Sequence, residues 1–252
     1  MNFIIYFVLT VVAFGVVGYG GYFLVKRKLK KSLGDSNFNE LWDVMKNVKD
    51  MEREEYERPK SVSGMTKLLE PIILRDFPDF NKEVLYQKVE DNLNGIFRAL
   101  EKKDLTELEK KEDFILLENG IKEKIEDLKE QDITLSFSGV DFHGHAIKAY
   151  DKKEGMATIT ISSALEYFYQ NSKMKNEFAN VKKQTRYVTK FVYVYDESKV
   201  GGEDAVLVIR CPNCGAPLRG LGKIRCTYCG SDVDPINLKA WKMVEYKEDC
   251  GY

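Results

Sequence analysis

The sequence predicts an α+β fold in which helices come first and an antiparallel sheet follows, preceded by an apolar N-terminal helix and interrupted late by a cysteine-rich insertion. Three observations support this. Apolar residues recur at helical spacing as far as Leu128, they alternate with polar residues from Ile133 onward, and two C-x-x-C pairs interrupt the alternating part. Helices that precede strands along a chain bury their apolar stripes on one face of the sheet.

The composition is that of a folded domain with an appendage. The chain has 252 residues, 44% of them hydrophobic and 31% charged, which is enough for a substantial core. Its 39 basic residues are balanced by 40 acidic ones, so the overall charge gives no support for binding nucleic acid. Five cysteines are too few for a disulfide scaffold, which favours a reducing compartment.

Residues 1–25 contain an uncharged run from Phe3 to Val25. A helix of that length, at about 1.5 Å per residue, crosses a hydrocarbon core of about 30 Å. We therefore expect a single transmembrane helix. The alternative is a cleaved signal peptide, but no basic residue precedes the run, the run exceeds an ordinary signal core, and no small-x-small cleavage site follows.

A basic cluster follows the apolar run directly. Positive residues beside a span stay on the cytoplasmic side and attract anionic lipid headgroups, so we expect these side chains to lie at the membrane surface. The N-terminus would then be outside and the rest of the chain at the cytoplasmic face of the cell membrane. The cluster consists of Lys26, Arg27, Lys28, Lys30 and Lys31.

Residues 26–59 continue from this cluster into an amphipathic stalk helix that begins near Phe38 and ends at Arg58, before Pro59. Its apolar stripe could pack on the following domain, on the membrane surface or on a partner. The stripe consists of Leu41, Trp42, Met45, Val48 and Met51. Residues 60–79 form a connection with a short helix over 65–74.

The next helix starts at Asn81, which can cap it, and carries a long apolar stripe. That stripe consists of Leu85, Val89, Leu93, Ile96, Phe97 and Leu100. A capping box at Asp104 opens a short helix through Lys110. A third helix is predicted from Phe114 to Leu128, with Asn119 and Gly120 weakening its middle.

The strands are predicted from alternation of apolar and polar residues. They cover 133–137, 157–161 with a continuation over 165–169, 187–195, 205–209 and 241–246, which gives a sheet of four to six strands. Turn residues at 151–155 and 197–202 favour antiparallel neighbours.

The strongest chemical signal is the pair of motifs C-P-N-C-G and C-T-Y-C-G, which are separated by eleven residues between the inner cysteines. Each motif presents two sulfurs from one turn, and two such turns supply the four tetrahedral positions that Zn²⁺ prefers. The sequence therefore predicts one structural zinc ion held by Cys211, Cys214, Cys226 and Cys229, within a ribbon over 210–234. Four thiolates leave no position for water or substrate.

Two separate redox motifs are the alternative, but such motifs open a helix in a βαβ unit, whereas these lie among glycines and strand-like sequence. The ribbon falls between predicted strands and is therefore a hairpin insertion. Cys250 lies outside the pattern and is expected to be a surface thiol.

Candidates for catalysis are few, and we expect no enzymatic activity. His143 and His145 lie two apart and are too few to bind a metal, so we place them at a turn or strand edge. Asp141, His143 and Glu166 are the residues near strand interiors that could act as acid or base. No nucleophile elbow, phosphate loop or two-metal carboxylate set is found in the sequence.

From Lys60 to Glu248 the chain resembles the Tim-forty-four-like domain family, named for the membrane-tethering subunit of the mitochondrial import motor. The resemblance rests on Arg75–Phe80, the helix with Asn92–Leu100, the segment Lys103–Leu108 and the strands Tyr187–Tyr195 and Trp241–Val244. It implies, for residues 60–252, a cone-shaped fold of the nuclear-transport-factor-two-like kind, with a pocket under a curved sheet. It also implies membrane association and binding of lipid or protein partners.

These expectations favour a non-enzymatic, membrane-anchored binding module that acts in protein translocation or membrane-protein handling and whose protein partner is unidentified. One alternative is an enzyme or sensor that binds a small molecule in the pocket. Another is nucleic-acid binding by the ribbon through Arg210, Arg219, Lys223 and Arg225, but the sequence offers no aromatic and basic groove elsewhere.

Overall fold

The computed structural model describes residues 35–108, 111–153, 155–173, 180–196, 211, 213–214, 216, 224–233 and 239–249. The chain divides into two compact units, Met1–Glu55 and Tyr56–Tyr252. The expected membrane span, the basic cluster from Lys26 to Lys31 and Cys250 lie outside the described residues. Within the described ranges, no helix is both long and apolar enough to cross a bilayer.

The first unit is described through helix α2 (Asp35–Glu57), which runs just past the boundary between the units. The predicted stalk helix is therefore confirmed, with its end one residue before the predicted one. Val48 and Met51 of its apolar stripe are 48% and 68% exposed. Their exposure means that at these two positions the stripe is not buried, so its packing partner stays a prediction.

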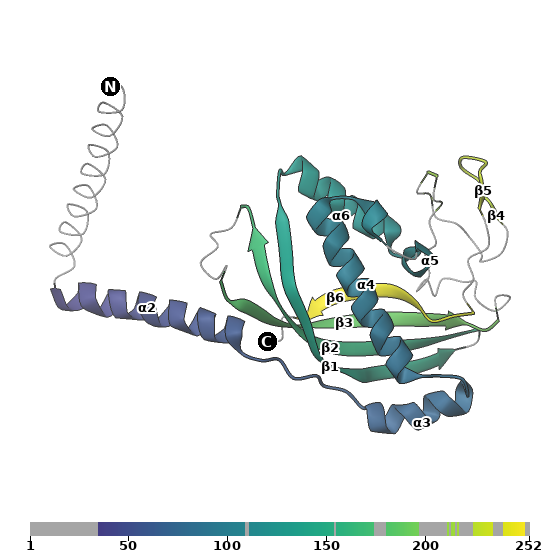
Figure 1. Ribbon diagram of the computed structural model, residues 1–252, viewed down its shortest axis with the longest axis horizontal. Coiled ribbons are helices and arrows are strands. Elements are labelled where there is room, and N and C mark those ends of the chain that lie inside the picture. Colours follow the sequence, from purple (N-terminus) through teal and green to yellow (C-terminus); the bar gives the residue numbers. More distant parts are fainter. Residues whose placement is uncertain are drawn as a thin grey trace, which may run out of the picture. The chain divides into compact units, whose positions relative to one another are not determined.

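The second unit consists of helices followed by a four-stranded antiparallel sheet, as the sequence predicts (Figure 1). The helical elements are α3 (Thr66–Asp76), α4 (Lys82–Lys102), the 3-10 turn η1 (Leu105–Glu107), α5 (Lys111–Phe114) and α6 (Glu118–Glu130). The sheet has the order β1 (Leu135–Lys153), β2 (Met156–Asn171), β3 (Lys182–Val194) and β6 (Lys242–Asp249). A separate two-stranded sheet pairs β4 (Ile224–Arg225) with β5 (Asp232–Val233).

Helix α4 crosses one face of the sheet (Figure 1). It begins where predicted, because the side chain of Asn81 accepts hydrogen bonds from the amides of Glu83 (2.9 Å) and Val84 (3.3 Å). The whole predicted stripe from Leu85 to Leu100 is buried in the core. The helix ends at Lys103, which has a left-handed backbone with φ 54°.

The predicted third helix is wrong at its start. The chain forms the short helix α5, turns at 115–117 and begins α6 at Glu118, so Asn119 and Gly120 lie in the first turn of α6. Of the predicted helix over 104–110, the described residues 104–108 contain the 3-10 turn η1 and no helix longer than it. Phe114 and Leu117 are buried, so the apolar spacing that suggested one helix arises from packing of the turn into the core.

The predicted strands that fall within the described residues are present as β1, β2, β3 and β6, and they are longer than the alternation indicates. The pairing of β1 with β2 continues through three irregularities, at 138–141, 142–144 and 147–149, and places His143 and His145 in an edge strand. The turn predicted at 151–155 joins β1 to β2, with Gly155 at φ 86°. The predicted turn at 197–202 and strand at 205–209 lie outside the described residues.

A segment before α3 closes part of the free edge of β1. The amide of Met65 donates to the carbonyl of Ile147 (2.8 Å), and the amide of Ile147 donates to the Thr66 hydroxyl (2.9 Å). A Cβ atom on Gly64 would lie 2.6 Å from the Ala146 Cβ and 2.7 Å from the Ile147 carbonyl oxygen. Only glycine allows so close an approach without movement of the backbone.

Candidate metal centre and neighbouring pockets

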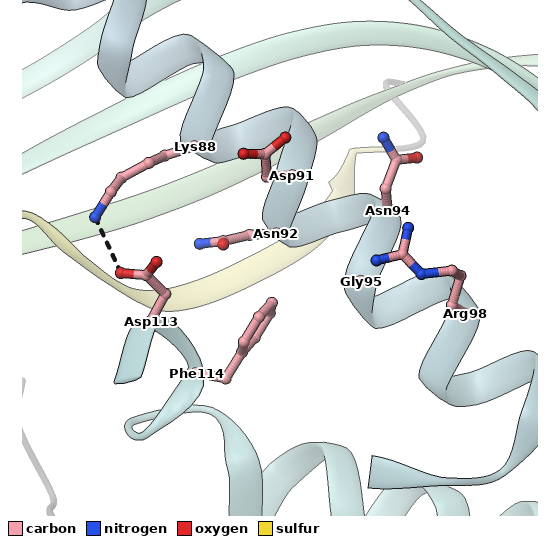
Figure 2. A pocket seen from close by; sticks show the side chains of 8 residues that line it. All are labelled: Lys88, Asp91, Asn92, Asn94, Gly95, Arg98, Asp113 and Phe114. Carbon is pink, nitrogen blue, oxygen red and sulfur yellow. Dashed lines mark hydrogen bonds and ion pairs between the residues drawn. The ribbon is translucent and has the colours of Figure 1, made fainter. Parts of the chain in front are cut away.

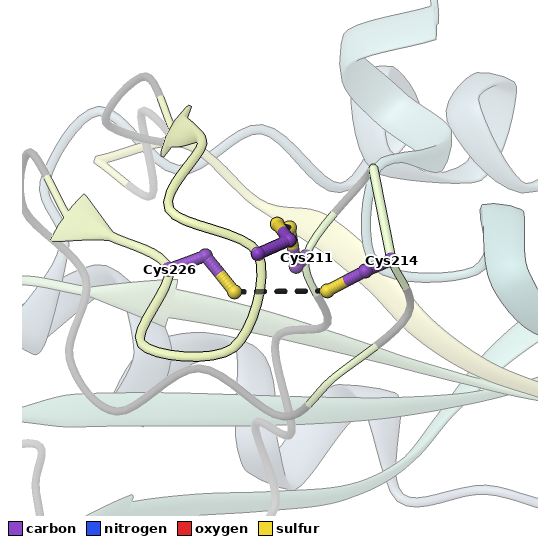
Figure 3. A group of neighbouring side chains, drawn as sticks. Cys211, Cys214 and Cys226 are labelled. Carbon is purple, nitrogen blue, oxygen red and sulfur yellow. Dashed lines mark hydrogen bonds between the residues drawn. The ribbon is translucent and has the colours of Figure 1, made fainter.

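The four predicted cysteines come together in one cluster. Figure 3 shows the side chains of Cys211 and Cys214, from the first cysteine turn, and of Cys226, from the second, pointing toward one another. The Sγ atoms of Cys214 and Cys226 are 3.6 Å apart, as are those of Cys211 and Cys229, and all four sulfurs lie within 4.8 Å of one another. Cys211 and Cys226 are buried, whereas Cys214 and Cys229 are exposed.

The two cysteine turns have matching backbone geometry. The amide of Cys211 donates to the carbonyl of Ala216 (2.8 Å), and that of Cys226 donates to the carbonyl of Ser231 (2.9 Å), which is five residues on in both cases. Gly230 follows the second pair with φ 72°, a conformation that suits glycine. The repeated turn explains why two cysteines spaced by two residues present their sulfurs to one point.

Polar side chains around the second turn hold the sulfur of Cys229 in position. Its sulfur lies 3.2 Å from the Ser231 hydroxyl, which also accepts a hydrogen bond from the Asn213 amide (2.8 Å). The hydrogen bond from Ser231 lowers the pKa of Cys229. Arg225 donates to the Gly230 carbonyl (3.0 Å), so this arginine of the nucleic-acid alternative supports the turn.

The cluster fits zinc. With Zn–S bonds of about 2.3 Å, the corners of a tetrahedron are about 3.8 Å apart. Two of the Sγ–Sγ distances, at 3.6 Å, are slightly shorter than this value, and no two of the four sulfurs are more than 4.8 Å apart. Four thiolates would complete the coordination of the ion, as in structural sites. The cluster can therefore hold a metal ion, and zinc is the one its chemistry favours.

A polar cavity of about 170 Å³ lies between α4 and α5. Figure 2 shows the amide of Asn92 pointing toward the place where Lys88 meets Asp113. Asn92 is 3% exposed, and its Nδ2 atom has no hydrogen-bond partner within the described part of the chain. A buried donor without a partner is costly, so this cavity is suited to an ordered water molecule. The cavity is lined by Lys88, Asp91, Asn92, Asn94, Gly95, Arg98, Asp113 and Phe114.

A larger and more aromatic pocket of about 500 Å³ opens beside the start of α4. We call it the aromatic pocket. Phe77, Tyr193 and Trp241 contact one another with ring centroids 5.0–5.5 Å apart, and Phe80 lies 6.2 Å from Trp241. Its size and lining are those of a small-molecule site. The wall is completed by Asp76, Pro78, Asp79, Asn81, Val84, Leu85, Lys88, Lys239 and Ala240.

The carboxylate of Asp76 at this pocket already has partners. The hydroxyl of Tyr150 donates to it (2.9 Å), and the Lys152 ammonium lies 3.5 Å away. The hydrogen bond from Tyr150 is the main reason that the pKa of Asp76 is lowered. Conversely, burial and this same contact raise the pKa of Tyr150. Asp76 is therefore a charged anchor between α3 and β1.

His145 is held between two polar groups. Its Nδ1 lies 2.8 Å from the Ser163 hydroxyl and its Nε2 lies 2.9 Å from a carboxylate oxygen of Glu90, while its ring stacks on Tyr86 at 5.0 Å. Serine, histidine and glutamate in a row resemble a hydrolytic triad. However, Ser163 is fully buried, so in this arrangement the row ties α4 to the sheet.

His143 and Glu166, two of the three predicted acid or base candidates, are brought together. The His143 Nε2 lies 3.3 Å from Glu166, which also pairs with Lys182 and accepts a hydrogen bond from Gln184. The hydrogen bond from Lys182 is the main cause of a lowered pKa at Glu166, which keeps this carboxylate charged. A carboxylate with a lowered pKa is poorly suited to donate a proton near neutral pH.

Sequence reasoning missed both pockets. The polar cavity depends on Asn92 and Asp113, which no motif marks. The aromatic pocket had one usable signal, the segment from Arg75 to Phe80, in which aspartate and phenylalanine recur beside a proline. In the sequence this segment falls in the predicted connection over 60–79 and in the family resemblance, and neither marks a pocket.

Comparison of the chain with protein-family models and with curated proteins finds no match.

Proposed function

We propose that the protein is a non-enzymatic, membrane-anchored binding module that presents an α+β domain and a structural zinc ribbon at the cytoplasmic face of the cell membrane. The observation that carries the proposal is the closed set of four sulfurs around one point. Such a site has no open position for a reacting group and acts by holding its surroundings together.

The position of the ribbon supports a bracing role. β3 pairs directly with β6, and the cysteine cluster lies in the chain that joins these neighbouring antiparallel strands. The ion would thus stabilise a long connection at one end of the sheet. The surfaces available for recognition are then those of the domain, and the resemblance described above suggests protein translocation or membrane-protein handling as the process.

The anchor is supported by the sequence alone, through the run Phe3–Val25 and the basic residues that follow. Full-length protein should remain in the membrane fraction after alkaline carbonate extraction, whereas a variant lacking residues 3–25 should be released. Recovery of the full-length chain in the extract would contradict the anchor.

The metal is tested by elemental analysis of the purified chain. We expect about one equivalent of zinc, lost in a variant that combines Cys214→Ser with Cys229→Ser. Cys250→Ser is the matched control and should keep the full complement. Zinc retained by the double variant would contradict the ligand set.

The binding role is tested by photo-crosslinking in intact membranes from positions on the exposed side of the domain, followed by identification of the captured chain. One dominant partner, lost when the domain is unfolded by a core substitution, would support the proposal. Absence of any captured chain at all positions would contradict it.

A second candidate is a small-molecule enzyme or sensor, favoured by the volume and lining of the aromatic pocket. Turnover of a bound compound by purified protein would support the enzyme over the binding module.

A further inference from the structure

The end of α3 and the turn after it contain two Asp-Phe pairs, Asp76-Phe77 and Asp79-Phe80. All four residues line the aromatic pocket. The two pairs therefore place two carboxylates and two aromatic rings at one opening, three residues apart in the chain. A carboxylate beside an aromatic ring is a combination that attracts organic cations.

The first pair already holds a cation from the same chain. The ammonium of Lys152 lies 3.5 Å from Asp76, 5.7 Å from the ring centroid of Phe77 and 5.6 Å from that of Tyr195. The protein thus uses this chemistry internally, with one carboxylate and two rings around one ammonium group.

The second pair offers the same chemistry to the pocket. The ring of Phe80 meets that of Trp241 at 75°, and Trp241 meets Tyr193 at 52°. Rings at steep angles form adjoining walls and not a stack. Asp79 is exposed, and within the described part of the chain no ion pair or side-chain hydrogen bond reaches its carboxylate. The second pair therefore places a carboxylate and an aromatic ring on the pocket wall beside Trp241.

Two lysines also line the pocket, and they must be weighed against this charge. The Lys88 ammonium donates to Asp113 (3.0 Å) and to the carbonyl of Trp241 (3.3 Å), so its charge is directed to groups of the protein. Lys239 is exposed, as Asp79 is, so solvent and salt screen both charges.

We propose that the aromatic pocket binds an organic cation with an alkylammonium group, which Phe80 and Trp241 contact through their rings and Asp79 balances in charge. The pocket volume of about 500 Å³ accommodates a small ligand of this class. This ligand class deepens the second candidate function above, which rests on the same pocket, and its binding depends on neither the membrane anchor nor the zinc site.

The test uses the full-length chain in a maltoside detergent, which has no ammonium headgroup. The protein has two tryptophans, so a Trp42→Phe background leaves Trp241 as the reporter. Choline is titrated while Trp241 fluorescence is followed, and its uncharged isostere 3,3-dimethylbutan-1-ol is titrated in parallel. We expect a saturable change with choline and binding of the isostere at least about fivefold weaker.

Two variants test whether Asp79 and Phe80 contribute to choline binding. Asp79→Asn removes the charge and keeps the shape, and Phe80→Leu removes the ring and keeps apolar volume. Each should weaken choline binding by about three- to tenfold. Asp132→Asn, an exposed aspartate with φ 49°, is the control and should leave binding unchanged. Thermal unfolding of each variant establishes that it is folded.

Equal binding of choline and its isostere would overturn the proposal, since the pocket would then be merely apolar. Unchanged binding in the folded Asp79→Asn and Phe80→Leu variants would also overturn it, as would no response to choline at millimolar concentration. Acetyl-trimethyllysine amide is the last probe. Binding of this probe more tightly than choline supports ammonium recognition and assigns the source to a peptide side chain, whereas tighter binding of choline assigns it to a free small-molecule ammonium compound.

Discussion

Asp113 is a buried carboxylate whose Oδ1 atom accepts hydrogen bonds from two lysines. Lys88 of α4 lies 3.0 Å away and Lys242 of β6 lies 3.1 Å away. Burial alone would raise the pKa of Asp113, but the hydrogen bonds from the two ammonium groups outweigh it and the pKa lies below the usual value. This one side chain therefore links α4, α5 and the last strand by charge.

Asp113→Asn should lower the free energy of unfolding by about 2 kcal/mol at pH 7, because two partly buried ammonium groups lose their counter-charge. The folded pKa is lower than the unfolded pKa of about 3.9, so the stabilisation is complete above that value. It is lost as the pH falls through the folded pKa. The difference between wild type and variant should therefore shrink progressively as the pH falls below about 3.9.

Urea unfolding of both proteins between pH 2.5 and 7 measures this difference, with Asp132→Asn as an exposed control. A difference that stays constant over the whole pH range would mean that Asp113 stabilises the fold through packing and not through its charge.

At the scale of the element, α4 is the helix on which the core depends. Leu93 is fully buried, whereas Val84 in the first turn of the same helix is 58% exposed. Leu93→Ala should lower the free energy of unfolding by about 3 kcal/mol through loss of apolar burial and an unfilled cavity. Val84→Ala should change it by less than about 0.5 kcal/mol. Equal effects in denaturant unfolding would contradict the packing described for α4.

The lead-in to α3 gives a second prediction at this scale. Gly64→Ala places a methyl group 2.6 Å from the Ala146 Cβ, so the backbone contacts with the edge of β1 must shift. We expect a loss of about 1–3 kcal/mol in the free energy of unfolding.

Gly120→Ala is the matched control, because nothing lies within 4 Å of a Cβ there and the residue is in α6. It should stabilise the protein by up to about 0.5 kcal/mol through helix propensity, because the residue lies in the first turn and not in the middle of the helix. If thermal unfolding shows Gly64→Ala to be as stable as Gly120→Ala, the segment before α3 can move away from β1 without loss of folding free energy.

The elements that sequence reasoning predicted well are those whose signals are local. Asn81 and the stripe that follows define α4, and the alternation over 157–161 defines part of β2. The break at 115–117 was missed because its cause is distant. The ring of Phe114 packs against Gly95, where a Cβ would lie 3.0 Å from the ring, and no periodicity within 111–128 reports that contact.

The candidate sites divide in the same way. The cysteine cluster follows from the spacing of two short motifs, whereas Asp113 meets Lys88 and Lys242 across 25 and 129 residues of chain. The aromatic pocket likewise joins Phe77 and Phe80 to Tyr193 and Trp241, which only the pairing of β3 with β6 brings close. Contacts between residues so far apart in the sequence can be predicted only once the fold is known.

At the scale of the whole molecule, the hydrophobic core and the cysteine cluster are separate. The core joins α3, α4 and α6 to the four-stranded sheet and includes none of the four cysteines. The cluster instead joins the two cysteine turns, and the described strands beside it, β4 and β5, have two residues each and flank the second turn. A small cysteine-rich segment of this kind depends on its metal for folding.

Removal of the metal by a chelator should therefore unfold the ribbon and leave the sheet intact. In hydrogen exchange, the amides of Cys226 and Gly230, which bond within the second turn, should lose protection. Amides in the central strands β2 and β3 should keep theirs, because the core that covers them is unchanged. Added zinc should restore the protection of the turn, and the chelated Cys250→Ser variant should behave as the wild type does. Parallel loss of protection in β2 and β3 would instead mean that the ion stabilises the entire sheet, and that the ribbon and the domain fold as one cooperative unit.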